Sequence, residues 1–195
     1  MFLPAAIAGF AGFSVLGFST AMAPAFMTQV LGYSNLLLIG AVSGTAFFAS
    51  IVGQRLQDRL KHAWRLPIGC VLVLVGAILI GTGIGLVSLG VFILGAFVVG
   101  LGQGIAMRAG LGDITAYSPA NQRSAVTSTF FVVTYVALSV PVLGIGLTAR
   151  YIGLPATGMG FAGFVALLAL VALILLLKRQ AQTSSASSNP SSSES

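Results

Sequence analysis

Long apolar stretches make up most of the chain, and each is close to the length that a helix needs to cross a bilayer. About 20 mainly apolar residues are required, and six stretches meet this requirement: 3–31, 35–54, 66–86, 88–111, 124–149 and 155–177. Turn-forming or charged residues separate them, except near residues 85–90, where the break carries no charge. The pattern predicts an all-α, polytopic membrane protein with six transmembrane helices.

Composition agrees with this prediction. Only 6% of the 195 residues are charged and 57% are hydrophobic, whereas a soluble domain typically carries about 25% charged residues. The net charge of +6 comes from basic residues in short gaps between apolar runs. That placement is typical of membrane topology signals, so the expected partner is the lipid bilayer and nucleic acid is not expected.

Lys and Arg are distributed unequally between the two ends of the predicted helices. One side collects Arg55, Arg59, Lys61, Arg65, Arg108, Arg123, Lys178 and Arg179, and the other has Arg150 alone. Cytoplasmic loops carry the excess of basic residues, so we expect the first side, and with it both termini, to be cytoplasmic. The expected location is the plasma (inner) membrane.

The last part of the chain is polar. We expect residues 1–178 to form the membrane domain and residues 179–195, which are rich in serine, to form a disordered cytoplasmic tail with nothing to bury. A solvated tail is the favoured interpretation of this segment, and a regulatory role is the alternative.

Polar residues are unevenly shared among the six stretches. The third holds only Cys70 and Thr82, and the sixth, over 158–177, holds nothing more polar than Met159, so both are expected to face lipid. The others carry polar groups that would be costly to leave unpaired in lipid. Such groups are found in the first (Ser14, Ser19, Thr20, Thr28, Gln29), second (Ser43, Ser50, Gln54), fourth (Gln103) and fifth stretches (Ser124, Ser128, Tyr135, Ser139).

Two interpretations of these polar residues remain open. The four on the fifth stretch fall on one helical face. They could form hydrogen bonds between helices, which is favoured for any single Ser or Thr, or they could line a water-filled cavity. For Gln103 and Tyr135 the two interpretations are equally supported. Small residues four apart, as at Gly40/Gly44, Gly81/Gly85 and Ala96/Gly100/Gly104, predict close helix packing.

Chemical groups for catalysis are missing from the spans. No Asp, Glu, Lys or His lies in the middle of one, so no internal proton relay of the carboxylate type is encoded. The sequence also has no metal-ligand cluster, nucleophile–base arrangement or phosphate loop. We therefore expect no catalytic residue, no metal and no cofactor, and an enzyme is not expected.

A loop motif introduces a family resemblance. The loop after the second stretch reads Gln54-Arg55-Leu56-Gln57-Asp58-Arg59-Leu60-Lys61. It is similar to the cytoplasmic motif of the major facilitator superfamily, Gly-x-Leu-Ala-Asp-Arg-x-Gly, with Gln54 and Lys61 in place of the glycines. Leu56, Asp58 and Arg59 match, and a simple positive-inside loop would not explain the Asp. The resemblance implies that Asp58 and Arg59 latch helix ends together across two halves.

Two further segments resemble bacterial efflux permeases of that superfamily. Ser118-Pro119 and Arg123, followed by 130–146, look like the eleventh helix, and Ser19-Thr20 through Pro24 to Gly32 look like the seventh. The resemblance covers residues 2–178 and implies a carboxy-terminal half built from inverted three-helix repeats. Proline weakens a helix, so Pro24 should kink the first helix. Pro141, with Gly144 and Gly146, should form a hinge in the fifth.

The resemblance implies a secondary transporter, or half of one. It would move a small organic solute by alternating access, with ion-coupled efflux as the expected direction. The expected path is lined by Ser19, Thr20, Gln103, Ser128, Tyr135 and Ser139, and a carboxylate for proton coupling would come from another half. The chain begins with Met1 directly at the first helix and would supply only one of the two halves of such a transporter. Three explanations compete. The chain could be a fragment or truncated product, which is favoured, it could pair with a separate first half, or it could pair with a second copy. The alternative function is a non-transporting scaffold, partner subunit or remnant, with a membrane enzyme a distant third.

Overall fold

Six long helices build the part of the protein that the structure describes. The computed structural model describes residues 2–116, 118–119 and 121–187. Its helices are α1 (Phe2–Ala25), continued by a π-helical segment (Phe26–Val30), α2 (Leu36–Leu56), α3 (His62–Gly85), α4 (Leu89–Ala116), α5 (Arg123–Ile152) and α6 (Leu154–Ser187), and a 3₁₀ turn (Gln57–Arg59) links α2 to α3. All six are long and apolar enough to cross a membrane. The all-α prediction with six spanning helices is confirmed.

Several helices run further than the sequence pattern predicted. The α4 helix continues through Gly112 and Asp113 to Ala116, and α3 begins at His62 rather than at residue 66. A helix can continue beyond the apolar region wherever its side chains find polar partners, and the side chains of His62 and Asp113 pair with each other. The hydropathy pattern therefore located the apolar parts of these helices rather than their ends.

The sixth helix also passes its expected end. It continues to Ser187, so residues 179–187, which we expected to be disordered, are helical, and residues 188–195 lie outside the described part. The segment from Lys178 to Ser187 has no glycine or proline to break the helix. The turn before α6 is very short, because Gly153 alone separates α5 from α6 and adopts a φ of +81°, which glycine tolerates without strain.

The chain leaves the α-helical pattern close to Pro24, where a kink is predicted. Pro24 lies inside α1, and the π-helical segment begins two residues later at Phe26. Proline removes a backbone hydrogen bond from a helix, and the Thr28 hydroxyl donates to the Pro24 carbonyl oxygen at 2.8 Å. In contrast, α5 continues as a single helix through Pro141.

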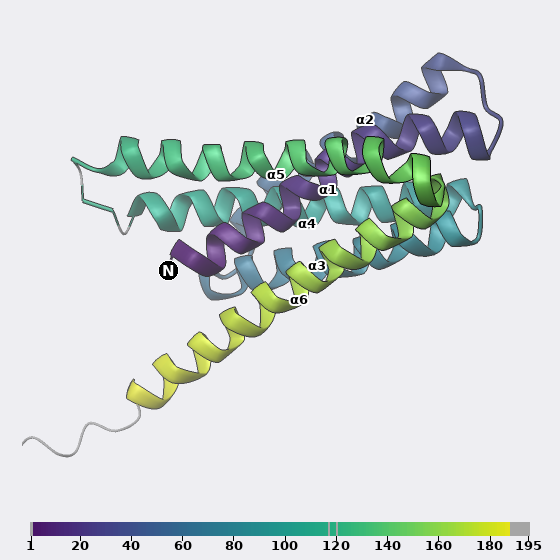
Figure 1. Ribbon diagram of the computed structural model, residues 1–195. Helices are drawn as coiled ribbons and strands as arrows, with labels where there is room; N and C mark the ends of the chain where they lie inside the picture. Colours follow the sequence, from purple (N-terminus) through teal and green to yellow (C-terminus); the bar gives the residue numbers. More distant parts are fainter. Residues whose placement is uncertain (1, 117, 120, 188–195) are drawn as a thin grey trace, which may run out of the picture.

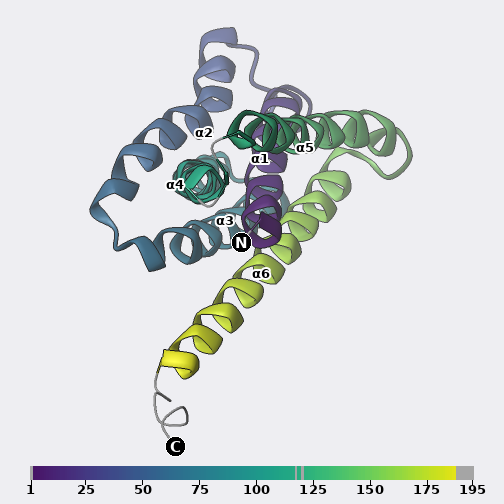
Figure 2. The same cartoon turned by 90° about the vertical axis from the view of Figure 1, so that its left-hand side faces the viewer.

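Two helices, α1 and α4, occupy the middle of the bundle (Figures 1 and 2). The α4 helix contacts α1, α2, α3 and α5, and α1 contacts α2, α3, α4, α5 and α6. Their buried aromatic residues form the centre of the core: Phe18 stacks on Phe161 of α6 at a centroid distance of 5.1 Å, and Phe26 packs on Phe92 at 5.3 Å.

Glycines bring α2 and α3 into backbone contact with α4. A Cβ added to Gly76 of α3 would lie 2.5 Å from the backbone nitrogen of Val99, and one added to Gly100 or Gly104 would collide with carbonyl groups of α2. These contacts confirm the predicted close packing at Ala96/Gly100/Gly104. Gly40 and Gly44 of α2, in contrast, have no neighbouring atom within 4 Å of such a Cβ, so this pair packs against no other helix in the described part of the chain.

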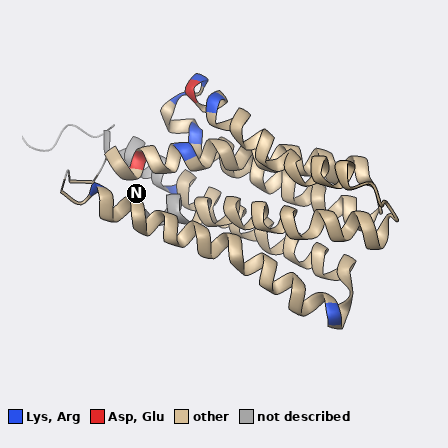
Figure 3. Cartoon of the chain, turned by 90° about the horizontal axis from the view of Figure 1, so that it is seen from above, with Lys and Arg blue, Asp and Glu red and all other residues tan. Residues whose placement is uncertain are grey.

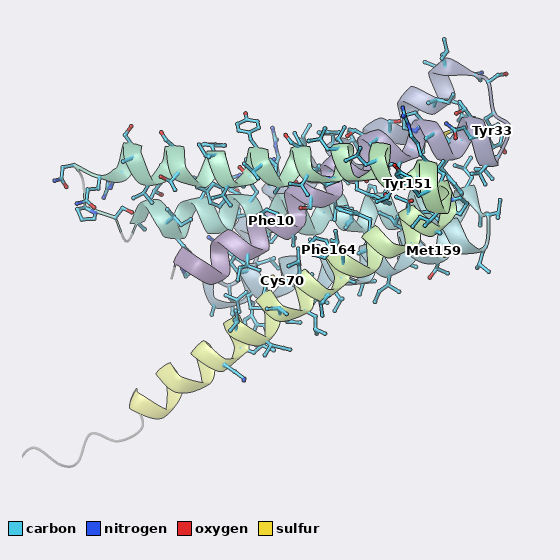
Figure 4. The ribbon with its side chains drawn as sticks, viewed as in Figure 1. Phe10, Tyr33, Cys70, Tyr151, Met159 and Phe164 are labelled. Carbon is cyan, nitrogen blue, oxygen red and sulfur yellow. The ribbon has the colours of Figure 1, made fainter. Side chains whose placement is uncertain are left out.

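The outer surfaces of α3 and α6 are mostly apolar, as expected for lipid-facing helices, with Thr82 as a polar exception on α3. Exposed residues on α3 include Val71, Val75 and Ile78, and exposed residues on α6 include Phe164 and Leu167. Figure 4 places Tyr33 and Tyr151 toward one end of the bundle, and both are exposed. Tyrosine is enriched where a membrane meets water, which suits the ends of the spans.

Charge is concentrated at the other end of the bundle. Figure 3 shows that most basic segments and both acidic segments gather at one end of the helices, with one basic segment at the opposite end. We call the first end, which holds the α2–α3 turn, the last turns of α4 and the start of α5, the charged end. Arg150 lies in the last turn of α5, at the opposite end.

Candidate functional site

A polar row on α5 faces away from the bundle. The buried face of α5 consists of Phe130, Thr134, Ala137, Pro141 and Ile145, spaced three and four residues apart as one side of a helix requires. The predicted path residues Ser128, Tyr135 and Ser139 lie on the opposite side and are exposed, with Tyr135 62% accessible.

The side chains of these three residues therefore do not hydrogen-bond α5 to the other described helices. The Ser139 hydroxyl bonds only within its helix, to the Tyr135 carbonyl oxygen at 3.0 Å. The Tyr135 ring lies near that of Phe131, at a centroid distance of 6.3 Å.

The two predicted path residues on α1 are separated by the structure. Consecutive residues of a helix point about 100° apart, and here Thr20 is exposed while Ser19 is buried. The Thr20 hydroxyl donates to the carbonyl oxygens of Leu16 and Gly17 at 3.1 and 2.8 Å, whereas the Ser19 hydroxyl finds no hydrogen-bond partner among the described residues. One turn before Thr20, Gly17 packs against the backbone of Leu138 on α5, so the exposed Thr20 lies near the contact between α1 and α5.

Gln103 joins three helices. Its side chain is 2% exposed, its Oε1 accepts a hydrogen bond from the Ser50 hydroxyl of α2 at 2.6 Å, and its Cγ lies 2.9 Å from where a Cβ of Gly12 on α1 would stand. In this structure Gln103 is an interhelical bridge and does not line open space. Its role in the path stays a prediction.

The bridge and the polar row lie at a similar depth. Gly9 of α1 packs against Phe130 and Thr134 of α5, and Gly12, one turn further on, packs against Gln103 of α4. Tyr135 and Gln103 therefore flank the same level of α1. Sequence reasoning did not select Ser50 as a site residue, although its position on one face with Ser43 and Gln54 was a usable signal.

The loop motif is tied to α4 at the charged end. The Asp58 carboxylate forms an ion pair with Arg108 at 3.2 Å, and Arg108 also donates to the Gln54 carbonyl oxygen at 2.9 Å. Leu56 and Arg59 are exposed. The pairing partner of Asp58 within this half was not identified from the sequence. A latch across two halves through Asp58 and Arg59 is not tested by a single half.

The hinge candidates differ in packing. Pro141 is buried, while a Cβ added to Gly144 or Gly146 would meet no atom within 4 Å. There is free space around these glycines, but hinge bending of α5 stays a prediction. No cluster of three potential metal ligands occurs among the described residues.

The architecture and this site define a multi-pass helical membrane protein with polar groups turned outward from the half-bundle. Residues 1–140 match the model of one family, the Major Facilitator Superfamily. The chain belongs to this family, and it is a transporter or part of one. No curated protein is found to match the sequence.

Proposed function

We propose that this chain is the carboxy-terminal half of a Major Facilitator Superfamily transporter and that it moves a small organic solute by alternating access. The number of helices supports the assignment as a half, since two inverted three-helix repeats require six. The observation that carries the transport proposal is the exposure of Ser128, Tyr135 and Ser139 on α5. Exposed residues of a purely lipid-facing helix would be mainly apolar, as they are on α3 and α6, where Thr82 is an exception.

The solute path runs along the open side of α1 and α5. Thr20, Ser128, Tyr135 and Ser139 present hydroxyl groups there, and hydroxyls both donate and accept hydrogen bonds. Ser19 and Gln103 are buried and join the path only when α1 moves relative to α4. Flexing near Pro24 and its π-helical segment, and near Pro141, Gly144 and Gly146, supplies that movement.

A second six-helix unit completes the cavity. Large apolar side chains on α2, including Phe47, Phe48 and Ile51, are exposed, so α2 as well as α5 has a surface available for a partner. That partner is a first half, encoded in the same or in a separate chain, or a second copy. Because the middle of the spans has no carboxylate, the partner also supplies any proton-coupling group.

Efflux is the proposed direction, with both termini in the cytoplasm of a cell whose plasma (inner) membrane holds the protein. The positive-inside rule supports this orientation, since the charged end holds nearly all of the basic residues (Figure 3).

A second function is favoured by a different observation. Gly40 and Gly44 form an unused close-packing pair on α2, which suits stable association with another membrane helix. A non-transporting scaffold, partner subunit or remnant would use this surface without moving a solute.

Transport in proteoliposomes tests the proposal. The purified chain, alone and with candidate first halves, is assayed with a panel of small organic solutes against imposed ion gradients. Tyr135→Ala should abolish most transport and leave the fold intact, because the side chain is mainly exposed. Tyr151→Ala changes an exposed tyrosine near the last residue of α5, away from the proposed path; it is the matched control and should keep wild-type transport.

The outcomes are distinct. Activity of the chain alone, lost in Tyr135→Ala, supports a second copy as the partner, and activity only with a first half supports a split or longer transporter. Transport that is equally impaired by both tyrosine substitutions contradicts the proposed path. If neither the chain alone nor any combination with a first half transports a solute, the scaffold or remnant is favoured.

A further inference from the structure

An aromatic pair lies in the middle of the exposed row on α5. The rings of Phe131 and Tyr135 are one turn apart, with centroids separated by 6.3 Å and planes inclined by 33°. Tyr135 is exposed and Phe131 is partly exposed. The buried Phe130 supports Phe131 from the inner side through an edge-to-face contact at 6.1 Å. The two rings therefore form a supported apolar surface that faces away from the bundle, and Phe131 has no role in the transport path proposed above.

Hydroxyl groups flank this aromatic pair on both sides. Ser128 lies about one turn before Phe131 and Ser139 about one turn after Tyr135, on the same face of the helix. The hydroxyls of Ser128 and Tyr135 find no partner among the described residues, and the Ser139 hydroxyl, which donates to the Tyr135 carbonyl oxygen, can still accept. From Ser128 to Ser139 the row extends for about 16 Å along the helix.

Tyr135 is deep in the membrane rather than at its surface. It stands 12 residues after Arg123 and 15 residues before Arg150, which corresponds to about 18 and 22 Å along the helix. Tyrosine is usually enriched at the membrane–water interface, where its hydroxyl meets water. A free phenolic hydroxyl at mid-depth is costly against lipid tails. This position therefore favours contact with a molecule that is apolar over the rings and polar at their edges.

The two helices beside the proposed path carry no charge within their apolar parts. Residues 2–31 and 124–149 contain no Asp, Glu, Lys, Arg or His. A charged group at this depth without a counter-charge is costly. This half therefore selects against a charge on the part of the solute that it contacts.

We propose that the transported solute presents an uncharged aromatic ring to Phe131 and Tyr135, and that a hydroxyl, carbonyl or amide group next to this ring hydrogen-bonds to Ser128 or Ser139. The inference rests on the proposed function, because it takes the row on α5 as a wall of the solute path. Contacts between aromatic rings add affinity beyond the area that they bury. Phe131 is thus a specificity-determining residue, which selects ring-containing solutes from other neutral solutes.

Binding of four matched compounds to the full chain in lipid nanodiscs tests the proposal. Benzamide is neutral and aromatic, cyclohexanecarboxamide lacks the aromatic ring, benzoate is an anion and benzylamine is a cation at neutral pH. Binding is followed by saturation-transfer NMR titrations, with the signal from empty nanodiscs subtracted. We expect benzamide to bind roughly 2- to 10-fold more tightly than cyclohexanecarboxamide, and at least about tenfold more tightly than either charged compound.

Three substitutions assign the preference to the aromatic pair. Phe131→Leu removes the ring and keeps an apolar side chain, so benzamide binding should weaken by roughly 2- to 10-fold while cyclohexanecarboxamide binding stays unchanged. Phe131→Tyr keeps a ring and should retain the preference for benzamide. Phe164→Leu is the matched control: Phe164 is an exposed residue of α6 (Figure 4) whose ring lies 5.9 Å from that of Phe161, and its loss should leave binding unchanged.

Several results would overturn the proposal. These are equal affinity for benzamide and cyclohexanecarboxamide, tighter binding of benzoate or benzylamine, equal losses in Phe131→Leu and Phe164→Leu, and no binding of any of the four compounds.

The same compounds in the proteoliposome assay separate this inference from the proposed function. Transport of the saturated or charged compounds at the rate of benzamide, lost in Tyr135→Ala, would support the path and contradict the aromatic preference. Benzamide binding that depends on Phe131, in a chain that transports no solute alone or with a first half, would support the aromatic surface and contradict transport.

Discussion

The hydrogen bond between Ser50 and Gln103 should contribute measurably to the stability of this half-bundle. Both residues are buried and their side-chain oxygens are 2.6 Å apart. The bond joins α2 to α4 where glycine packing already holds the two backbones together, with Gly104 against the Ser50 carbonyl group. Removing one side chain therefore leaves its partner buried, since the helices cannot separate to admit water.

The magnitude follows from the setting of the bond. Hydrogen bonds between membrane helices average about 0.6 kcal/mol in double-mutant cycles and reach about 1.7 kcal/mol. The short distance and full burial of this pair place it in the upper part of the range, so we expect a coupling energy of about 1 to 1.5 kcal/mol. The coupling energy should not exceed this range, because without Gln103 the Ser50 hydroxyl can rotate toward a carbonyl oxygen of its own helix, as the Ser43 hydroxyl does toward Ile39.

A double-mutant cycle measures this coupling. Ser50→Ala, Gln103→Leu and the double variant are unfolded reversibly in mixed micelles, and the three changes in unfolding free energy are compared. The control cycle pairs Gln103→Leu with Ser43→Ala, which should be additive to within about 0.5 kcal/mol, because the Ser43 hydroxyl bonds only within α2. A Ser50–Gln103 coupling no larger than that of the control would refute the reasoning.

Three further predictions concern packing, accessibility and the loop motif. Gly76→Ala should lower the free energy of unfolding by about 1 to 3 kcal/mol, because the added Cβ would overlap the backbone of α4. The control Gly40→Ala should change it by less than about 0.5 kcal/mol. Reversible unfolding measures both values. Cys70, which is buried, should react with a maleimide only after unfolding, and labelling of the folded protein at the rate of a free thiol would contradict its placement. Asp58→Asn should lower the free energy of unfolding by at most about 1 kcal/mol, since both members of the ion pair between Asp58 and Arg108 are about half exposed. A decrease in unfolding free energy that persists at high salt would contradict this interpretation.

The sequence predicted the helical architecture well because hydropathy reports directly on the membrane. Each span is a local property of about 20 consecutive residues, and all six predicted spans are present. Helix ends were predicted less well: the polar residues His62 and Asp113 look like loop residues in a hydropathy pattern, yet they pair with each other and lie within α3 and α4.

The burial and contacts of the predicted path residues could be foreseen only in part, for a geometric reason. Helical periodicity places Ser128, Tyr135 and Ser139 on one face of α5, and the structure turns that face outward. Periodicity along one helix does not show what another helix covers, so it could not separate buried Ser19 from exposed Thr20 or find Ser50 as the partner of Gln103.

By itself, then, the sequence determined the class of protein, the number of spans and the asymmetric distribution of charge, since each depends on the order of residues along the chain. Only the tertiary structure decided which polar groups are exposed on the outside of the bundle and which bridge helices. Those roles depend on contacts between residues far apart in sequence, such as Asp58 with Arg108 and Ser50 with Gln103. The close approach of α2 and α4 at Gly100 and Gly104 makes both pairings possible.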